Sequence, residues 1–276
     1  MLRGMTIAII LDSRTKKHSS SVASCENCAY RSRCVINKIS IEEVASLSGT
    51  LITRSTLKKG QYLYRRGEPF SGVYSLRFGA IKNELVFHDG VPQVTHFSIP
   101  GDLLGLDGMG NGKHQLDAVC LNAVEVCSIP MPDVGRMTKD YPEFMGNVGS
   151  LLGTLLNASY THNYDLSNLN PLQRLADFLS NYSNRLSTVG LNRDDFVLPM
   201  PRPDLANYLG MAVETLSRSL THLEQVGAIE VSTRKIKFIS RKPVFELLNS
   251  DTMREKHESM KSKTHSYRPF SEKRKP

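Results

Sequence analysis

Hydrophobic and polar positions alternate loosely over residues 51–130 and predict a series of short β-strands. The stretches "GVYSLRFGAIKNELVF" and "QVTHFSIPGDLLGL" show this pattern, and glycines recur through the region at spacings typical of turns. The segment "HDGVP" at 88–92 adds a hairpin signal, because Asp-Gly readily adopts positive φ. Together these features predict an antiparallel β-roll or jelly roll.

The pattern then changes to one typical of a long helix. Residues 144–164 contain no charged side chain, and candidate seam residues recur at alternating steps of three and four. Three glycines weaken this segment as an isolated helix, so packing must support it. We expect it to join two copies of the chain in a homodimer; the alternative is a helix buried against its own barrel. The expected dimerisation residues are Met145, Val148, Leu152, Leu155, Ser159 and His162.

Two further helical patterns follow. Residues 171–187 begin with proline and keep leucines on one face, which predicts a helix. The segment from 201 to 240 then predicts a helix from about 203, a turn at Gly210, a second helix over about 213–226, a stop at Gly227 and two short strands. This order is typical of a winged helix-turn-helix, which binds double-stranded DNA.

The second helix of this pair carries candidate base-reading residues. Glu214, Ser217 and Arg218 stand at i, i+3 and i+4, where the first turns of a recognition helix reach the major groove. Their chemistry suits a G·C pair. The alternative is an exposed Glu214–Arg218 ion pair, which contributes little. The expected phosphate contacts are Arg202, Thr215, His222, Arg234 and Lys235.

Composition supports a nucleic-acid partner and argues against a membrane. The chain has 276 residues, enough for two domains, and a net charge of +8 with a pI near 9.2. Residues 251–276 carry eight Lys or Arg against four Asp or Glu, so we expect a basic disordered tail. The seven-residue apolar run at 5–11 is too short for a membrane span and lacks the small-residue cleavage site of a signal peptide. We therefore expect a cytoplasmic protein.

Five cysteines point to a metal centre. Cys25, Cys28 and Cys34 lie within ten positions, whereas Cys120 and Cys127 are distant. The odd count and the absence of a secretory signal favour reduced thiols over disulfides. Three clustered thiols with one distant partner could hold either zinc or an iron-sulfur cluster.

Three segments resemble the fumarate-nitrate-reduction (FNR) branch of the CRP/FNR superfamily of bacterial transcription regulators. They are "GDLLGLDGMGNG" at 101–112, "EVCSIP" at 125–130 and "NYLGMAVETLSR" at 207–218, and the likeness covers residues 25–248. The spacing C-x2-C-x5-C of Cys25, Cys28 and Cys34 resembles the same branch. An ungapped match assigns the distant ligand to Cys127, which leaves Cys120 as a small buried hydrophobe.

The resemblance implies a function. In such proteins four thiolates bind a 4Fe-4S cluster, the loaded dimer binds a palindromic TTGAT-like site without oxygen, and roll loops such as residues 88–91 contact RNA polymerase. Relatives that bind cyclic nucleotides use a glutamate just after a roll glycine and a downstream arginine. Here Leu106 follows Gly105, and residues 107–130 contain no arginine. We therefore expect an oxygen-sensing activator that binds no cyclic nucleotide.

The expected fold class is α+β: an antiparallel β-roll, a long dimerisation helix and a C-terminal winged helix. The expected ranges are 1–24 (N-terminal extension), 25–50 (cluster-binding arm and first helix), 51–135 (β-roll), 136–168 (dimerisation helix), 169–248 (DNA-binding domain) and 249–276 (basic tail). Zinc-stabilised or cluster-independent constitutive DNA binding is the alternative. An enzyme is not expected, because "GMGNG" at 108–112 lacks the G-x-G-x-x-G spacing and no P-loop, H-E-x-x-H or G-x-S-x-G motif is present.

Overall fold

The computed structural model describes residues 21–22, 25, 28–37, 39–40, 42–43, 52–87 and 90–249. Almost all of the expected N-terminal extension and the basic tail therefore lies outside the described residues. The chain divides into two compact units, one of Met1–Ile81 with Ser98–Val148 and the other of Lys82–Phe97 with Gly149–Pro276.

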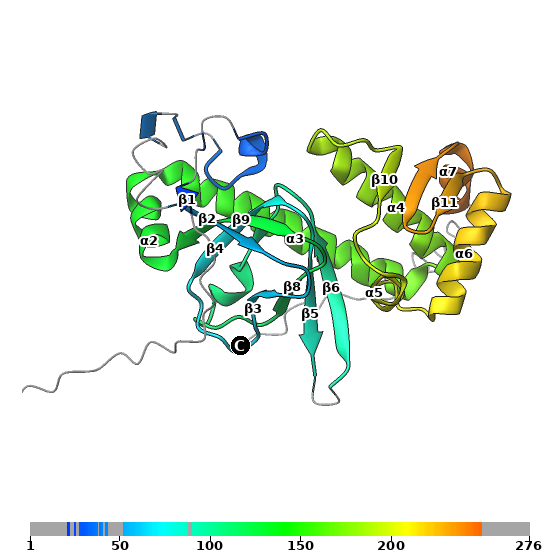
Figure 1. The fold of residues 1–276 in the computed structure, drawn as a ribbon, viewed down its shortest axis with the longest axis horizontal. Coiled ribbons are helices and arrows are strands. Elements are labelled where there is room, and N and C mark those ends of the chain that lie inside the picture. Colours follow the sequence, from blue (N-terminus) through cyan, green and yellow to red (C-terminus); the bar gives the residue numbers. More distant parts are fainter. Residues whose placement is uncertain are drawn as a thin grey trace, which may run out of the picture. The chain divides into compact units, whose positions relative to one another are not determined.

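The first unit is built on an antiparallel five-stranded sheet of order β1-β2-β9-β4-β7 (Figure 1). Its strands are β1 (Ser21–Val22), β2 (Thr53–Leu57), β4 (Gly72–Phe78), β7 (Leu103–Leu104) and β9 (Val124–Pro130). A second antiparallel pair joins β3 (Tyr62–Tyr64) to β8 (Asp117–Cys120). The helical elements are η1 (Arg31–Arg33), η2 (Leu106–Gly108) and α2 (Met131–Asp140).

The two faces of the five-stranded sheet have different roles, because side chains alternate along each strand. One face contributes Leu57, Leu76, Val124 and Val126 to the hydrophobic core, together with Cys120 and other buried residues. The opposite face carries Cys127 on β9. In the strand register Cys127 pairs with Arg54 on one side and with Ser75 on the other. The sheet therefore fixes polar residues beside this cysteine.

Glycines make the tight turns of the roll, as the sequence predicts. Gly79 has φ of +85°, and an added Cβ would lie 2.2 Å from the carbonyl oxygen of Ala123. Only glycine fits there. In the expected hairpin at 88–92, Gly90 has φ of +74°, whereas residues 88 and 89 lie outside the described part.

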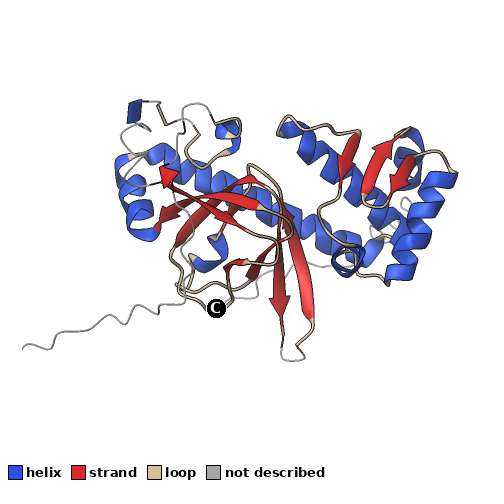
Figure 2. Cartoon of the chain, in the orientation of Figure 1, coloured by secondary structure: helices blue, strands red, loops and turns tan. Residues whose placement is uncertain are grey.

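The second unit contains a winged helix-turn-helix (Figure 2). The hairpin strands β5 (Ile81–Val86) and β6 (Pro92–Ser98) are neighbours, and a three-stranded sheet has the order β10-β12-β11. The remaining elements are α4 (Pro171–Thr188), β10 (Asp195–Val197), α5 (Arg202–Tyr208), α6 (Val213–Gln225), β11 (Ile229–Ser232), β12 (Lys235–Phe238) and α7 (Lys242–Leu248). The predicted helix pair and wing are confirmed, whereas β10 and α7 were not predicted.

The range 136–168 does not form one helix. α2 ends at Asp140, Tyr141 leaves the helical conformation with φ of −133°, and α3 (Pro142–Asn168) begins at a proline. Proline is favourable at a helix start because an N–H in the first turn has no carbonyl partner within the helix, so its absence costs nothing. None of the helices in the described ranges is long and apolar enough to cross a membrane.

Candidate metal centre and nucleic-acid interface

Four of the five cysteines line one pocket in the first unit. Cys25, Cys28 and Cys34 reach it from the N-terminal arm (residues 25–40), and Cys127 reaches it from β9. All five cysteines of the chain are free thiols. The other lining residues are Tyr30, Arg31, Ile36, Ile52, Arg54, Ser75, Arg77 and Ile129. The structure thus brings together the four residues predicted as metal ligands.

Successive turns fold the arm around the pocket. The N–H of Arg31 donates to the carbonyl oxygen of Cys28 over 3.1 Å, and the N–H of Cys34 donates to that of Arg31 over 3.0 Å. Val35 is fully buried and anchors the segment. Asn147 on α3 donates from Nδ2 to the carbonyl oxygen of Val35 over 3.0 Å. The arm is therefore packed in place by α3 as well as by the sheet.

Burial makes the pocket thiols weak acids. It raises the pKa of Cys127 to about 12, although the nearby charges of Arg77 and Arg54 act in the opposite direction. Burial is also the largest cause of the raised pKa of Cys25 and of Cys34. At neutral pH these thiols keep their protons unless an electropositive group displaces them, which is how metal binding is coupled to proton release.

Cys120 has a different environment. Its side chain is 2% exposed within the hydrophobic core, and burial raises its pKa to about 11. It does not line the cysteine pocket. The expected role as a small buried hydrophobe agrees with this position.

The four pocket thiols were expected to hold either an iron-sulfur cluster or a zinc ion. Among the described residues, no three or more His, Cys, Asp or Glu side chains are arranged to hold a single metal ion. Zinc requires its sulfur ligands about 2.3 Å from one point. The four thiols instead surround a pocket with isoleucine walls. The chemistry of this donor set fits an iron-sulfur cluster, because soft thiolates are the ligands of such clusters.

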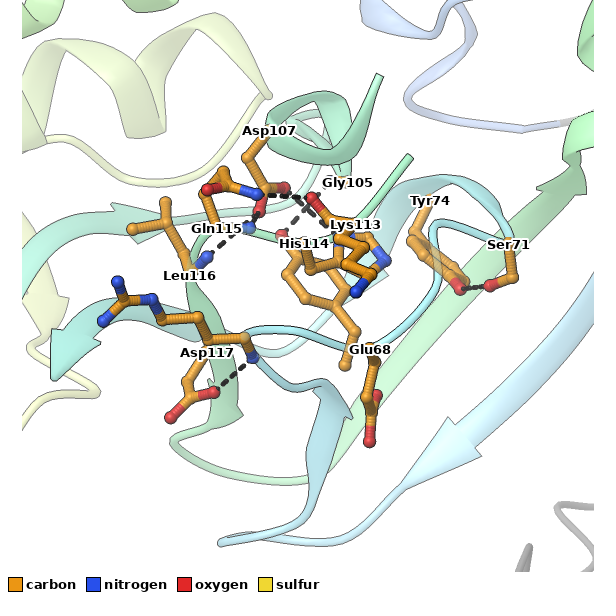
Figure 3. Close-up of polar contacts among 12 residues, drawn as sticks. Glu68, Ser71, Tyr74, Gly105, Asp107, Lys113, His114, Gln115, Leu116 and Asp117 are labelled. Atoms are coloured by element: carbon orange, nitrogen blue, oxygen red, sulfur yellow. Dashed lines mark hydrogen bonds and ion pairs between the residues drawn. The ribbon is translucent and has the colours of Figure 1, made fainter. Parts of the chain in front are cut away.

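A carboxylate fills the loop after β7. Asp107 accepts hydrogen bonds from the backbone N–H of Gln115 at 2.7 Å and of Leu116 at 3.1 Å (Figure 3). His114 beside it is 1% exposed and stacks on Tyr64 with ring centroids 3.8 Å apart. Successive backbone N–H groups in a turn are the usual anion-binding feature of such loops. Here the side chain of Asp107 is the anion that they bind.

The second helix of the pair, α6, exposes the predicted base-reading residues. Glu214, Ser217 and Arg218 are exposed, whereas Leu216 and Leu220 are buried. No ion pair joins Glu214 to Arg218, both of which the structure describes; the Arg218 guanidinium instead lies 3.4 Å from Thr215 Oγ1. The alternative reading of a simple surface ion pair therefore does not apply, and both side chains remain available.

The expected phosphate contacts are partly engaged within the unit. Arg202 donates to the carbonyl oxygen of Thr233 over 2.9 Å, and burial lowers its pKa. Arg234 donates to the carbonyl oxygen of Pro199 over 3.1 Å. Lys235 forms an ion pair of 3.0 Å with Asp195. Arg202 in particular braces the turn between β11 and β12 rather than extending freely into solvent.

The predicted seam residues on α3 do not share one environment. Val148 is 1% exposed within its own unit, Leu155 and His162 are partly buried, and His162 stacks on Tyr208 with ring centroids 4.1 Å apart. Val148 cannot therefore belong to a surface seam. The exposed large apolar residues of the helix are Met145, Leu152, Leu156, Tyr160 and Tyr164, at 40%, 42%, 51%, 61% and 38% exposure. The last three were not predicted, and Leu156 and Tyr160 lie on the helical stripe beside the predicted one.

Arg54, Ser75 and Arg77 beside the cysteine pocket were also missed. They lie on strands β2 and β4, and only the pairing of these strands with β9 places them near Cys127. No spacing within the sequence carries that signal.

Comparisons with known proteins agree with this architecture. Residues 54–141 match the cyclic nucleotide-binding domain family and residues 173–242 match the Crp-like helix-turn-helix domain family. The chain is 32% identical to the transcriptional regulatory protein btr of Bordetella pertussis, covering 85% of this chain and 97% of btr. It is 31% identical to the anaerobic regulatory protein of Pasteurella multocida, covering 77% and 78% of the two chains. The solved structure of FixK2 from Bradyrhizobium japonicum matches with a TM-score of 0.66 and 25% identity, covering 71% of this chain and 97% of FixK2.

Proposed function

Because the chain belongs to the CRP/FNR family of DNA-binding transcription regulators, we propose that it is an oxygen-responsive activator controlled by a 4Fe-4S cluster. The family consists of regulators and not of enzymes. The observation that carries the proposal is the single pocket lined by Cys25, Cys28, Cys34 and Cys127. A relative whose name describes an anaerobic regulator supports the same reading.

The four thiols would hold the cluster. When bound, the cluster would supply an oxygen-labile link between the N-terminal arm and β9. Three of its ligands lie on the arm and the fourth lies on a strand whose other face builds the core. The zinc alternative is less favoured because zinc sites usually pair two C-x2-C motifs, whereas here three clustered thiols have one distant partner.

The hydrogen bonds of Asn147 would couple the arm to dimerisation. Asn147 contacts the carbonyl oxygens of Val35 and Asn37, and it lies on the same helix as Met145 and Leu152. Ordering of the arm would therefore favour one packing of α3. This gives the two-state element that a ligand-controlled switch requires.

The homodimer seam would follow the exposed apolar stripe of α3. It comprises Met145, Leu152, Leu156 and Tyr160. Among the described residues, a Cβ added to Gly146, Gly149 or Gly153 would meet nothing within 4 Å beyond the adjacent backbone of its own helix. These glycines would let a second helix approach closely. A twofold dimer would place two α6 helices on half-sites about one helical turn, 34–36 Å, apart.

Base contacts would come from Glu214, Ser217 and Arg218 at the start of α6, on a TTGAT-like palindrome. RNA polymerase would contact roll loops near 88–91, where Val91 is 60% exposed. Such a regulator acts in the bacterial cytoplasm. Cyclic nucleotides would not bind, because Asp107 already occupies the loop N–H groups and Leu106 replaces the glutamate. Calorimetric titration of cyclic AMP into the protein should therefore give no binding heat.

The decisive experiment is purification without oxygen, followed by iron and sulfide analysis, visible absorption, and DNA binding before and after air. We expect a coloured protein whose DNA affinity falls on exposure to air. Cys28→Ser should lose the colour and the anaerobic gain in affinity. The matched control is Cys120→Ala, which removes a core thiol and should keep both. A colourless, iron-free protein that binds DNA equally in either atmosphere would refute the proposal.

A further inference from the structure

Three arginines line the cysteine pocket together with the four thiols: Arg31, Arg54 and Arg77. A buried site that must accept several thiolates therefore has cations built into its wall.

The sheet fixes the position of two of these cations relative to Cys127. Arg54 on β2 is the direct register partner of Cys127 on β9. Ser75 on β4 is its partner on the other side, and Ser75 Oγ lies 3.6 Å from Cys34 Sγ. The β4 register shifts between Leu76 and Phe78, at the position of Arg77. A bulge of this kind re-aims the side chain at the bulged residue.

Glu125 holds the guanidinium groups in place. Arg77 Nη1 lies 3.1 Å from Glu125 Oε1, and Arg54 Nε lies 3.7 Å from the same oxygen. Arg77 Nε is buried and has no hydrogen-bond acceptor among the residues that the structure describes, and neither has Arg31 Nη1. Buried N–H groups normally have an acceptor. Cysteine sulfur carrying negative charge is an acceptor that this pocket can offer.

We propose that Arg77, oriented by Glu125, is a positioning residue for the sulfur ligands. Its guanidinium places a positive charge and an N–H donor beside them, which strengthens retention of the cluster and raises the reduction potential of the cluster. This inference rests on the proposed function. Four thiolates leave a bound cluster with net negative charge, and adding an electron increases that charge. A nearby guanidinium favours the reduced form, because net charge and hydrogen bonds to sulfur set cluster potentials.

The test compares four variants of the full-length protein loaded without oxygen. Arg77→Gln should lower the midpoint potential and weaken retention of iron against a chelator about 10- to 100-fold. Arg77→Lys keeps the charge and should recover part of both properties. Glu125→Gln removes a negative charge but keeps an oxygen that can accept from Arg77, so its potential should rise. Lys59→Gln removes one exposed positive charge from the same unit and should leave both the midpoint potential and the retention of iron unchanged.

The outcomes separate the two proposals. An iron-free wild-type protein would refute the proposed function, and this inference with it. A loaded wild type, with Arg77→Gln matching Lys59→Gln in potential and retention, would refute only the role of Arg77. If circular dichroism shows that Arg77→Gln does not fold, Arg77→Lys and Glu125→Gln decide instead: shifts of opposite sign support the inference, and two unchanged potentials overturn it.

Discussion

Asn147 donates a hydrogen bond to the carbonyl oxygen of Val35, the residue that follows Cys34, over 3.0 Å. Its side-chain amide also bonds to the carbonyl oxygen of Asn37. The arm and the helix proposed to dimerise are therefore connected by one side chain. Its removal should separate cluster loading from pairing of the subunits.

Asn147→Ala should retain iron but dimerise more weakly without oxygen. Loss of hydrogen bonds that leaves partly buried acceptors unsatisfied costs about 1–3 kcal/mol, which corresponds to an association about 5- to 150-fold weaker. Sedimentation velocity of the anaerobic protein measures this, with iron analysis on the same sample. Asn157→Ala, at an exposed position of the same helix, is the control. An unchanged dimer would show that the arm signals by another route.

Lys82 joins the β5–β6 hairpin to the helix before α6. Its ammonium lies 3.0 Å from Asp204 and 2.8 Å from Glu84, and the three side chains are 15%, 20% and 9% exposed. Lys82→Met would leave two carboxylates without their cation and should destabilise the protein by about 3 kcal/mol. Denaturant unfolding tests this against Lys242→Met, whose side chain is 81% exposed and whose loss should cost under about 0.5 kcal/mol. Equal losses would contradict the prediction.

A carboxyl pair between α3 and α4 should make stability depend on pH. Burial, with the nearby charge of Asp177, raises the pKa of Asp165 to about 7, and burial also raises that of Asp177. The folded state then binds protons more tightly than the unfolded state. The contribution of this pair is therefore fully present below about pH 4 and is lost as pH rises through 7.

Burial lowers the pKa of His162 on the same helix, so its protonation opposes the carboxyl pair as pH falls. Comparison with Asp165→Asn isolates the pair. This variant should lose the pair's pH dependence and gain stability relative to wild type above pH 7. Thermal unfolding of both proteins from pH 5 to 8 measures how the stability of each changes with pH. If the two proteins showed the same change of stability with pH, the carboxyl pair would not be the source of the pH dependence.

Two arginines near the recognition helix should behave differently in DNA binding. Arg218→Ala should cost about 1–3 kcal/mol and relax the preference at one guanine. Arg202→Ala should weaken binding to all sequences alike and lower thermal stability, because Arg202 holds the carbonyl of Thr233 in the wing. Competition binding with substituted half-sites distinguishes them. A uniform loss for Arg218→Ala would make it a phosphate contact instead.

The sequence predicts the roll, the helix pair and the wing because each rests on local periodicity and on turn residues such as Gly79 and Gly210. It also predicts which cysteines belong together, through spacing and family likeness. It does not predict Arg54 or Arg77 beside Cys127, because strand register arises from pairing between distant segments. The burial of Val148 on α3 was not predicted for a related reason. Val148 satisfies the heptad spacing, but only tertiary packing decides that it faces inward.

The position of Cys127 affects how the switch could recover. Its strand is paired on both sides, and the neighbouring residue Val126 is fully buried in the core. Loss of the cluster would therefore leave the Cys127 sulfur, Arg54 and Arg77 in position on the sheet, so this half of the binding site would stay formed. Only the arm would have to return, so an inactivated regulator should be rechargeable without refolding or new synthesis.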